Sequence, residues 1–180
     1  MSIRLIGANP GLILFEGEGD TPKAYASVWR VDWSERGAGN AIVAWYDRRL
    51  RVVGSDPRLG EWLAGSFNRH FPEVRDLDWP EPEITTAPVD YAADLGHGIR
   101  AEGADIVVEI TDPADRRLIH ADEFRLGSDV NSLSTVITPC RHGSLTIAGK
   151  AMPGSPRVSD GPPVSSTAFM ADAEVWSWPT

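Results

Sequence analysis

Apolar and polar residues alternate with a period of two along most of the chain, which is typical of strands that bury one face. In segment 24–33, four large apolar side chains share one face, and Arg30 and Asp32 lie on the other. The four are Tyr25, Trp29, Val31 and Trp33. Alternation and β-branched runs predict further strands at 40–46, 49–54, 104–111, 117–127, 133–140, 144–152 and 167–178, and in the N-terminal segments IRLIG and LILFEGE.

One segment, about 57–70, has apolar residues at helical spacing instead. Ser55 or Asp56 can cap the free backbone N–H groups at its start, and Pro57 suits the first turn. Glycines within the segment weaken an isolated helix, so we expect it to form only when its apolar stripe docks on the sheet. The predicted stripe consists of Leu59, Trp62, Leu63, Phe67 and His70 or Phe71.

The order of these elements predicts one mainly β domain over 1–180. Residues 72–90 are rich in Pro and acids and indicate an irregular connector, and residues 153–166 indicate a mobile loop. An antiparallel meander of this length leaves exposed edges unless it closes, so we expect a lipocalin-like barrel or a strongly curved sheet. A two-sheet sandwich is also compatible with the pattern.

Composition narrows the classes of partner. The net charge is −9, so the surface repels phosphate backbones, and no basic block suggests a membrane surface. A single cysteine and the absence of a recognisable signal peptide favour the cytoplasm. The 15 Arg against 2 Lys favour a GC-rich bacterial source. We therefore expect neither nucleic acid nor membrane as a partner, while a homodimer stays open.

The only cysteine, Cys140, lies two residues from His142 in the stretch TVITPCRHGSLTIAG. Strand patterns on both sides, with Gly143 available for a turn, place this pair at the tip of a hairpin. A nucleophilic thiol needs a base and an orienting group held rigidly, and a hairpin tip offers neither. We interpret Cys140 as a structural residue of the turn.

The strand 117–127 carries the candidate site. Period-two alternation places Leu118, His120, Asp122, Phe124 and Leu126 on one face. If this face points inward, His120 and Asp122 must be hydrogen-bonded. Three interpretations stay open: the pair satisfies itself in the core, it orients a ligand in a cavity, or it binds iron. The His-x-Asp spacing resembles the metal motif of double-stranded β-helix oxygenases, whose second histidine here would have to be His142.

No phosphate-binding loop, dinucleotide fingerprint, nucleophile elbow or zinc spacing occurs, so the main prediction includes no cofactor and no metal. In the last strand, alternation places Asp172 and Glu174 on one face together with Met170, Trp176 and Trp178. On an outer face these two carboxylates would simply be solvated.

These observations predict a small-molecule binding protein that holds a largely apolar ligand in a β-barrel cavity. The predicted apolar wall consists of Trp29, Trp33, Leu118 and Phe124, with His120 and Asp122 as the polar groups within it. One alternative is a cofactor-independent isomerase, cyclase or hydro-lyase that uses His120 as general acid or base, with Asp122 fixing its tautomer. A further alternative is a non-haem iron protein.

Overall fold

A computed structural model describes residues 1–180, and the fold is mainly β with one short α-helix. The strands up to the middle of the chain are β1 (Ser2–Ala8), β2 (Gly11–Leu14), β3 (Ala24–Ser34), β4 (Gly39–Tyr46), β5 (Arg49–Gly54), β6 (Glu83–Thr86) and β7 (Val89–Asp94). The later strands are β8 (Gly98–Gly103), β9 (Ile106–Pro113), β10 (Arg117–Leu126), β11 (Asp129–Ile147), β12 (Lys150–Ala151), β13 (Val158–Ser159), β14 (Ser165–Ser166) and β15 (Ala168–Trp178). The helices are α1 (Pro57–Ser66) and the single 3-10 turn η1 (Asn68–His70).

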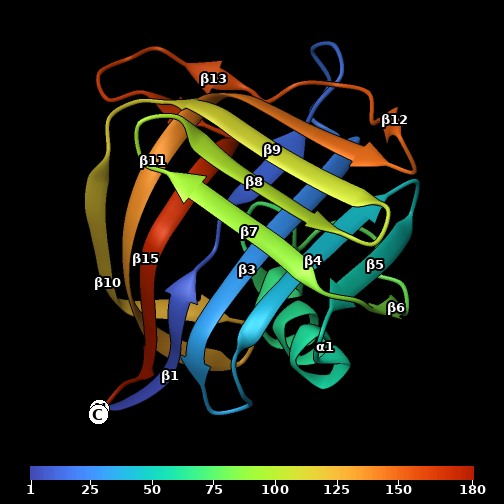
Figure 1. Ribbon diagram of the computed structural model, residues 1–180. Helices are drawn as coiled ribbons and strands as arrows, with labels where there is room; N and C mark the ends of the chain where they lie inside the picture. The colour runs from blue at the N-terminus through green and yellow to red at the C-terminus, as the bar shows by residue number, and fades with distance from the viewer.

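Thirteen strands form one large curved sheet. Its hydrogen-bonded order is β6-β5-β4-β3-β1-β15-β11-β9-β8-β7, with β2, β10 and β12 attached beside this path. All neighbours are antiparallel except β5 and β6. The sheet folds over so that β7, β8 and β9 cross in front of β3 and β4 (Figure 1). Because β1 pairs with β15, both chain ends lie at the same side of the molecule (Figure 1).

The space between the two halves of the sheet is filled by a first core of twenty buried residues. One face of β3 and β4 supplies small and branched side chains, and β9 and the second half of β11 face them. Representative members are Ala26, Val28, Ile42, Val108, Ile110 and Leu145. Packed apolar side chains therefore occupy the interior in which we had predicted a ligand cavity.

A second core lies on the opposite face of β3, β4 and β5, where α1 packs (Figure 1). The predicted N-cap is confirmed, because Asp56 accepts hydrogen bonds from the backbone N–H groups of Arg58 and Leu59. The helix ends at Ser66, four residues before the predicted end at residue 70. Asn68 explains the early end, because its buried side chain accepts from Trp29 and donates to Tyr25 from within η1.

Two segments predicted as loops contain strands. Within 72–90, β6 pairs with β5 and β7 begins at Val89, so this connector is partly ordered in the sheet. The hairpin of β7 and β8 was not predicted, because its short strands carry few large apolar residues. Within 153–166, β13 and β14 pair with one another. None of the helices is long and apolar enough to span a bilayer.

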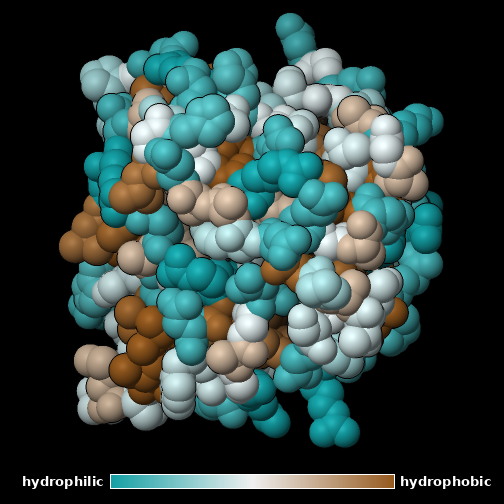
Figure 2. All heavy atoms as spheres, viewed as in Figure 1, coloured by the Kyte–Doolittle hydropathy of each residue, from teal (hydrophilic) through white to brown (hydrophobic).

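Several large apolar side chains remain on the surface of the sheet. Figure 2 shows apolar groups over the side of the molecule where β1, β10 and β15 lie. The exposed large apolar residues of these three strands are Ile3, Leu118, Ile119 and Val175. This surface matters for the predicted site, because β10 was expected to turn Leu118 inward.

Candidate functional site

A β-bulge in β10 divides the predicted site face. Ala121 pairs with Leu133 and Phe124 pairs with Asn131, so two residues of β10 lie opposite one residue of β11. Before the bulge, the even-numbered residues point to solvent, and after it they point to the second core. The prediction that the even-numbered residues from 118 to 126 share one inward face is therefore wrong. Leu118 is 70% exposed, whereas Leu126 is buried.

The His120 and Asp122 side chains are hydrogen-bonded to one another on the exposed face. The distance from His120 Nε2 to Asp122 Oδ1 is 2.9 Å, and His120 Nδ1 lies 2.8 Å from Ser134 Oγ on β11. With its proton on Nε2, the ring donates to Asp122 and accepts from the Ser134 hydroxyl. The Asp122 side chain is 93% exposed. This pair does not line the interior of the fold.

The four residues of the predicted apolar wall are not brought together. Trp29 is fully buried beneath α1, and its ring meets Phe67 edge-on at a centroid distance of 5.4 Å. Trp33 is 49% exposed near the end of β3, and Leu118 lies on the solvent face of β10. Of the four, Phe124 lines a cleft of about 190 Å³.

That cleft, which we call the Glu174 cleft, lies between the sheet and the chain segment that follows η1. Its volume is about 190 Å³, and eight of its twelve lining residues are hydrophobic. They come from β10, β11, β15, the segment after η1 and the β1–β2 turn. The lining residues are Asn9, Phe71, Glu73, Ile119, Phe124, Leu133, Thr135, Ile137, Phe169, Ala171, Glu174 and Trp176.

The floor of the Glu174 cleft carries two buried polar side chains that face one another across strands. Thr135 on β11 and Glu174 on β15 are direct register partners, and each is only 6% exposed. Glu174 accepts a hydrogen bond from the indole N–H of Trp176. The Thr135 hydroxyl lies close enough to Glu174 to favour the charged form of its carboxyl group. It nevertheless has no hydrogen-bond partner of good geometry. A buried hydroxyl group without a hydrogen-bond partner destabilises the fold. A bound molecule could supply that partner.

Burial also changes the pKa of the Glu174 carboxyl group. Removal from water raises the pKa of Glu174 to about 7, against the opposing effects of the Trp176 N–H and the Thr135 hydroxyl. Near neutral pH this carboxyl is therefore divided between its neutral form, which can donate a hydrogen bond, and its charged form. Perturbed carboxyl groups in apolar clefts are frequent at functional sites.

Aromatic rings form one end of the cleft around Trp176. Phe124 meets the Trp176 ring edge-on at 5.3 Å, and Phe71 stacks on it at 6.1 Å. At the other end, Phe169 packs over Gly11, where an added Cβ would lie 2.7 Å from the phenyl ring. These rings hold the apolar walls in place, since each contacts a neighbour from another element.

A second bulge explains why sequence analysis missed Glu174. Val136 pairs with Ala173 and Ile137 pairs with Ala171, so Asp172 is an extra residue in β15. Met170 therefore lies in the first core, although its predicted face-mate Glu174 lies in the cleft. Asp172 instead forms an ion pair with Arg116, at 2.7 Å. A strict period of two cannot reveal such a change of face.

The predicted hairpin at Cys140 is also wrong, because β11 runs without interruption from residue 129 to residue 147. Its first half pairs with β10 and β15, and its second half pairs with β9. Gly143 does not form a turn. An added Cβ there would collide with Leu12 Cδ1, so the glycine permits a close strand crossing.

Cys140 and His142 do not form a reactive pair. Cys140 is buried in the first core, and burial raises the pKa of its thiol to about 11. His142 is exposed and lies 3.7 Å from Asp112. The structure also brings no three His, Cys, Asp or Glu side chains together as a metal site, so His142 does not complete the proposed iron ligands.

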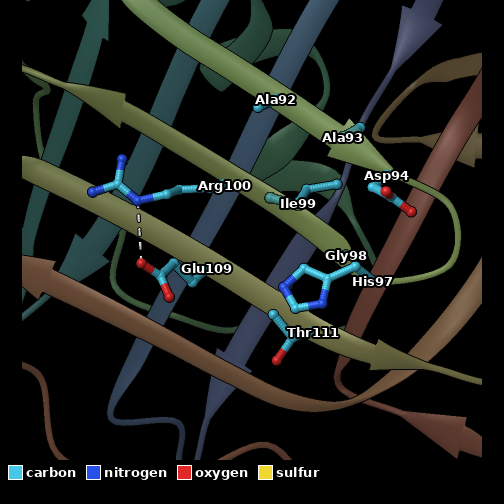
Figure 3. A pocket seen from close by; sticks show the side chains of 9 residues that line it. All are labelled: Ala92, Ala93, Asp94, His97, Gly98, Ile99, Arg100, Glu109 and Thr111. Atoms are coloured by element: carbon cyan, nitrogen blue, oxygen red, sulfur yellow. Dashed lines mark hydrogen bonds and ion pairs between the residues drawn. The ribbon is translucent and has the colours of Figure 1, made fainter.

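A larger hollow of about 320 Å³ lies on the outer surface of β7, β8 and β9 (Figure 3). Figure 3 shows Arg100 turned toward Glu109, with which it forms an ion pair at 3.2 Å, and away from His97. Arg100 also pairs with Glu102. Since Arg100 and Glu109 are exposed and paired with one another, this hollow offers a ligand less than the Glu174 cleft does.

Comparisons with protein-family models, with curated proteins and with solved structures found no match to this chain. The functional argument therefore depends on the geometry and chemistry of the site itself.

Proposed function

We propose that the protein binds a small, largely apolar molecule in the Glu174 cleft. The observation that carries this proposal is the buried pair of Glu174 and Thr135 in an otherwise mostly apolar recess. Ligand sites commonly combine apolar walls with a few polar groups that fix orientation. Here the walls can hold the apolar body, while the unpartnered Thr135 hydroxyl and the Glu174 carboxyl can contact one polar head group.

This proposal keeps the predicted class of ligand and moves its location. A lipocalin-like barrel with a ligand inside is not required, because the cleft lies outside the packed interior. Of the predicted contact residues, Phe124 belongs to this site. Trp176 replaces Trp29 and Trp33 as the tryptophan beside the ligand.

Two neighbouring residues of β10 provide a matched test. Ile119 lines the cleft, whereas Leu118 points to solvent from the opposite face. Ile119→Trp should narrow the cleft and weaken binding of 1-octanol by about tenfold or more, and Leu118→Trp should leave it unchanged. Isothermal titration calorimetry measures both affinities. Absence of saturable 1-octanol binding by the wild type, or equal loss in both variants, would refute the proposal.

A second candidate function is proton transfer by His120. This candidate is supported by the orientation of the His120 ring, which hydrogen bonds to Asp122 and to Ser134 hold in place. Because His120 faces away from the Glu174 cleft, it would act on a molecule bound at the outer surface. Exchange of the α-hydrogens of cyclohexanone with D2O, followed by NMR, should then be faster with wild type than with His120→Gln. Equal rates would remove this candidate.

A further inference from the structure

We propose that the Glu174 cleft selects apolar molecules with a cationic head, such as hydrophobic amines or quaternary ammonium ions. This inference rests on the proposed function and names its class of ligand. Two of the twelve lining residues are carboxylic acids, Glu73 and Glu174, and none is Lys, Arg or His. An anionic head would therefore meet like charge without any compensating cation.

The charged groups around the floor of the cleft also favour a cationic ligand. Glu174 comes from β15, Glu73 comes from the segment after η1, and β10 and β11 contribute no charged lining residue. Tyr25 on β3 is close enough to sense both carboxylates, but burial raises the pKa of its phenol, which keeps it neutral. The field inside the cleft is consequently that of the two acids.

Two arginines of the strands around the cleft form ion pairs with other acids. Arg4 lies 3.2 Å from Asp129 and 3.7 Å from Glu35, and it stacks against rings of the second core. Arg116 is paired with Asp172. Neither arginine lines the cleft, so neither can hold the carboxylate of a fatty acid there.

Aromatic rings add a second attraction for a cation. Phe124 and Phe71 each contact the ring of Trp176, whose indole N–H donates to the Glu174 carboxyl. The electron-rich face of an aromatic ring attracts ammonium groups, and the effect is stronger where water is excluded. A quaternary ammonium ion suits such a site, because it has no N–H donors that would need partners.

Glu174 must be charged to attract a cation fully, so binding should depend on pH. A bound cation stabilises the carboxylate and lowers the pKa of Glu174, which burial raises in the free protein. By linkage, affinity for a permanently charged cation should rise as the pH increases through the pKa of the free protein. Affinity for a neutral ligand should not rise in this way.

Three probes of equal chain length test the inference by titration calorimetry: octyltrimethylammonium, 1-octanol and octanoate. The heads of octyltrimethylammonium and 1-octanol keep their charge across the range used, from about pH 5.5 to about pH 8.5, and octanoate is mostly ionised throughout it. We expect octyltrimethylammonium to bind about tenfold more tightly at the higher pH and to exceed both other probes there. The affinity for 1-octanol should stay constant.

Glu174→Gln is the decisive variant. Glutamine keeps the size of the side chain and an oxygen that can accept from Trp176, but it removes the charge. It should abolish the pH dependence and reduce the preference for the cation to the part that Glu73 supplies. Glu73→Gln provides a second, independent variant at the mouth of the cleft, and it should weaken cation binding several-fold at high pH.

The outcomes separate this inference from the proposed function. If the wild type binds 1-octanol but prefers octanoate, or binds the cation no more tightly than 1-octanol at the higher pH, the cationic class of ligand is wrong and the binding function stands. If the wild type binds none of the three probes, both proposals fail.

Discussion

Two hydrogen-bonded side-chain pairs in this protein have the same spacing along a strand and opposite surroundings. Glu174 and Trp176 are two residues apart on β15 and are buried in the cleft, whereas His120 and Asp122 are two residues apart on β10 and face solvent. Each pair lies beside a β-bulge. The difference shows that burial, more than the hydrogen bond itself, determines the chemistry of such a pair.

The largest contrast expected is in stability. Trp176→Ala removes the ring on which Phe67, Phe71 and Phe124 pack and should destabilise the fold by about 3–5 kcal/mol. Trp33→Ala on the exposed end of β3 should cost about 1 kcal/mol or less. Urea unfolding of both variants measures the difference. Similar losses would show that the aromatic cluster contributes little to the second core.

The buried carboxyl should produce the next largest effect, as a dependence of stability on pH. The folded-state pKa of Glu174 is raised from its ordinary 4.5 to about 7, so the protonated carboxyl favours folding at low pH. This contribution is lost as the pH rises from about 4.5 to about 7. At 1.36 kcal/mol per unit, the shift corresponds to about 3 kcal/mol.

Glu174→Gln has no such ionisation, so its stability relative to wild type should increase by about 3 kcal/mol between pH 4.5 and pH 8. Denaturant melts across this range measure the change. Glu123→Gln, which removes an exposed carboxyl of β10, is the matched control. If the two variants behave alike across the pH range, burial of Glu174 is not the cause.

Cys140 and His142 on β11 are also two residues apart, with one side chain buried and the other exposed. Cys140→Ser places a hydroxyl in the first core and should destabilise the protein by about 1–3 kcal/mol, whereas His142→Ser should change stability by less than about 0.5 kcal/mol. Because the thiol is buried and its pKa is raised, iodoacetamide should alkylate Cys140 only in denaturant. Rapid alkylation of the native protein would contradict this placement.

The smallest effect on stability is expected for the exposed pair of His120 and Asp122. Asp122→Asn should change the unfolding free energy by less than about 0.5 kcal/mol, since water replaces the lost carboxylate around a side chain that is almost fully solvated. A denaturant melt checks this value. A loss above about 1 kcal/mol would indicate that His120 depends on Asp122 for a structural role.

Local signals in the sequence predicted most of the strands and the start of the helix. The Asp56 cap followed by Pro57 identifies the beginning of α1 because a cap acts only on neighbouring backbone groups. Period-two alternation identifies β3 well, since Tyr25 and Trp29 share the face that packs under the helix. Such features depend on residues that are close together in the chain.

The tertiary structure alone decided which face each part of a strand presents. The bulges at 122–123 and at Asp172 reverse the alternation, so that Leu118 faces solvent and Glu174 faces the cleft. A bulge arises where curvature changes the register between neighbouring strands, and β11 supplies that register from more distant parts of the chain. The sequence by itself determined that this protein has a curved β-sheet, a docked helix and polar residues within apolar strands. The pairing of Thr135 with Glu174, 39 positions later, required the folded sheet, because only hydrogen bonding between separate strands brings these two side chains together.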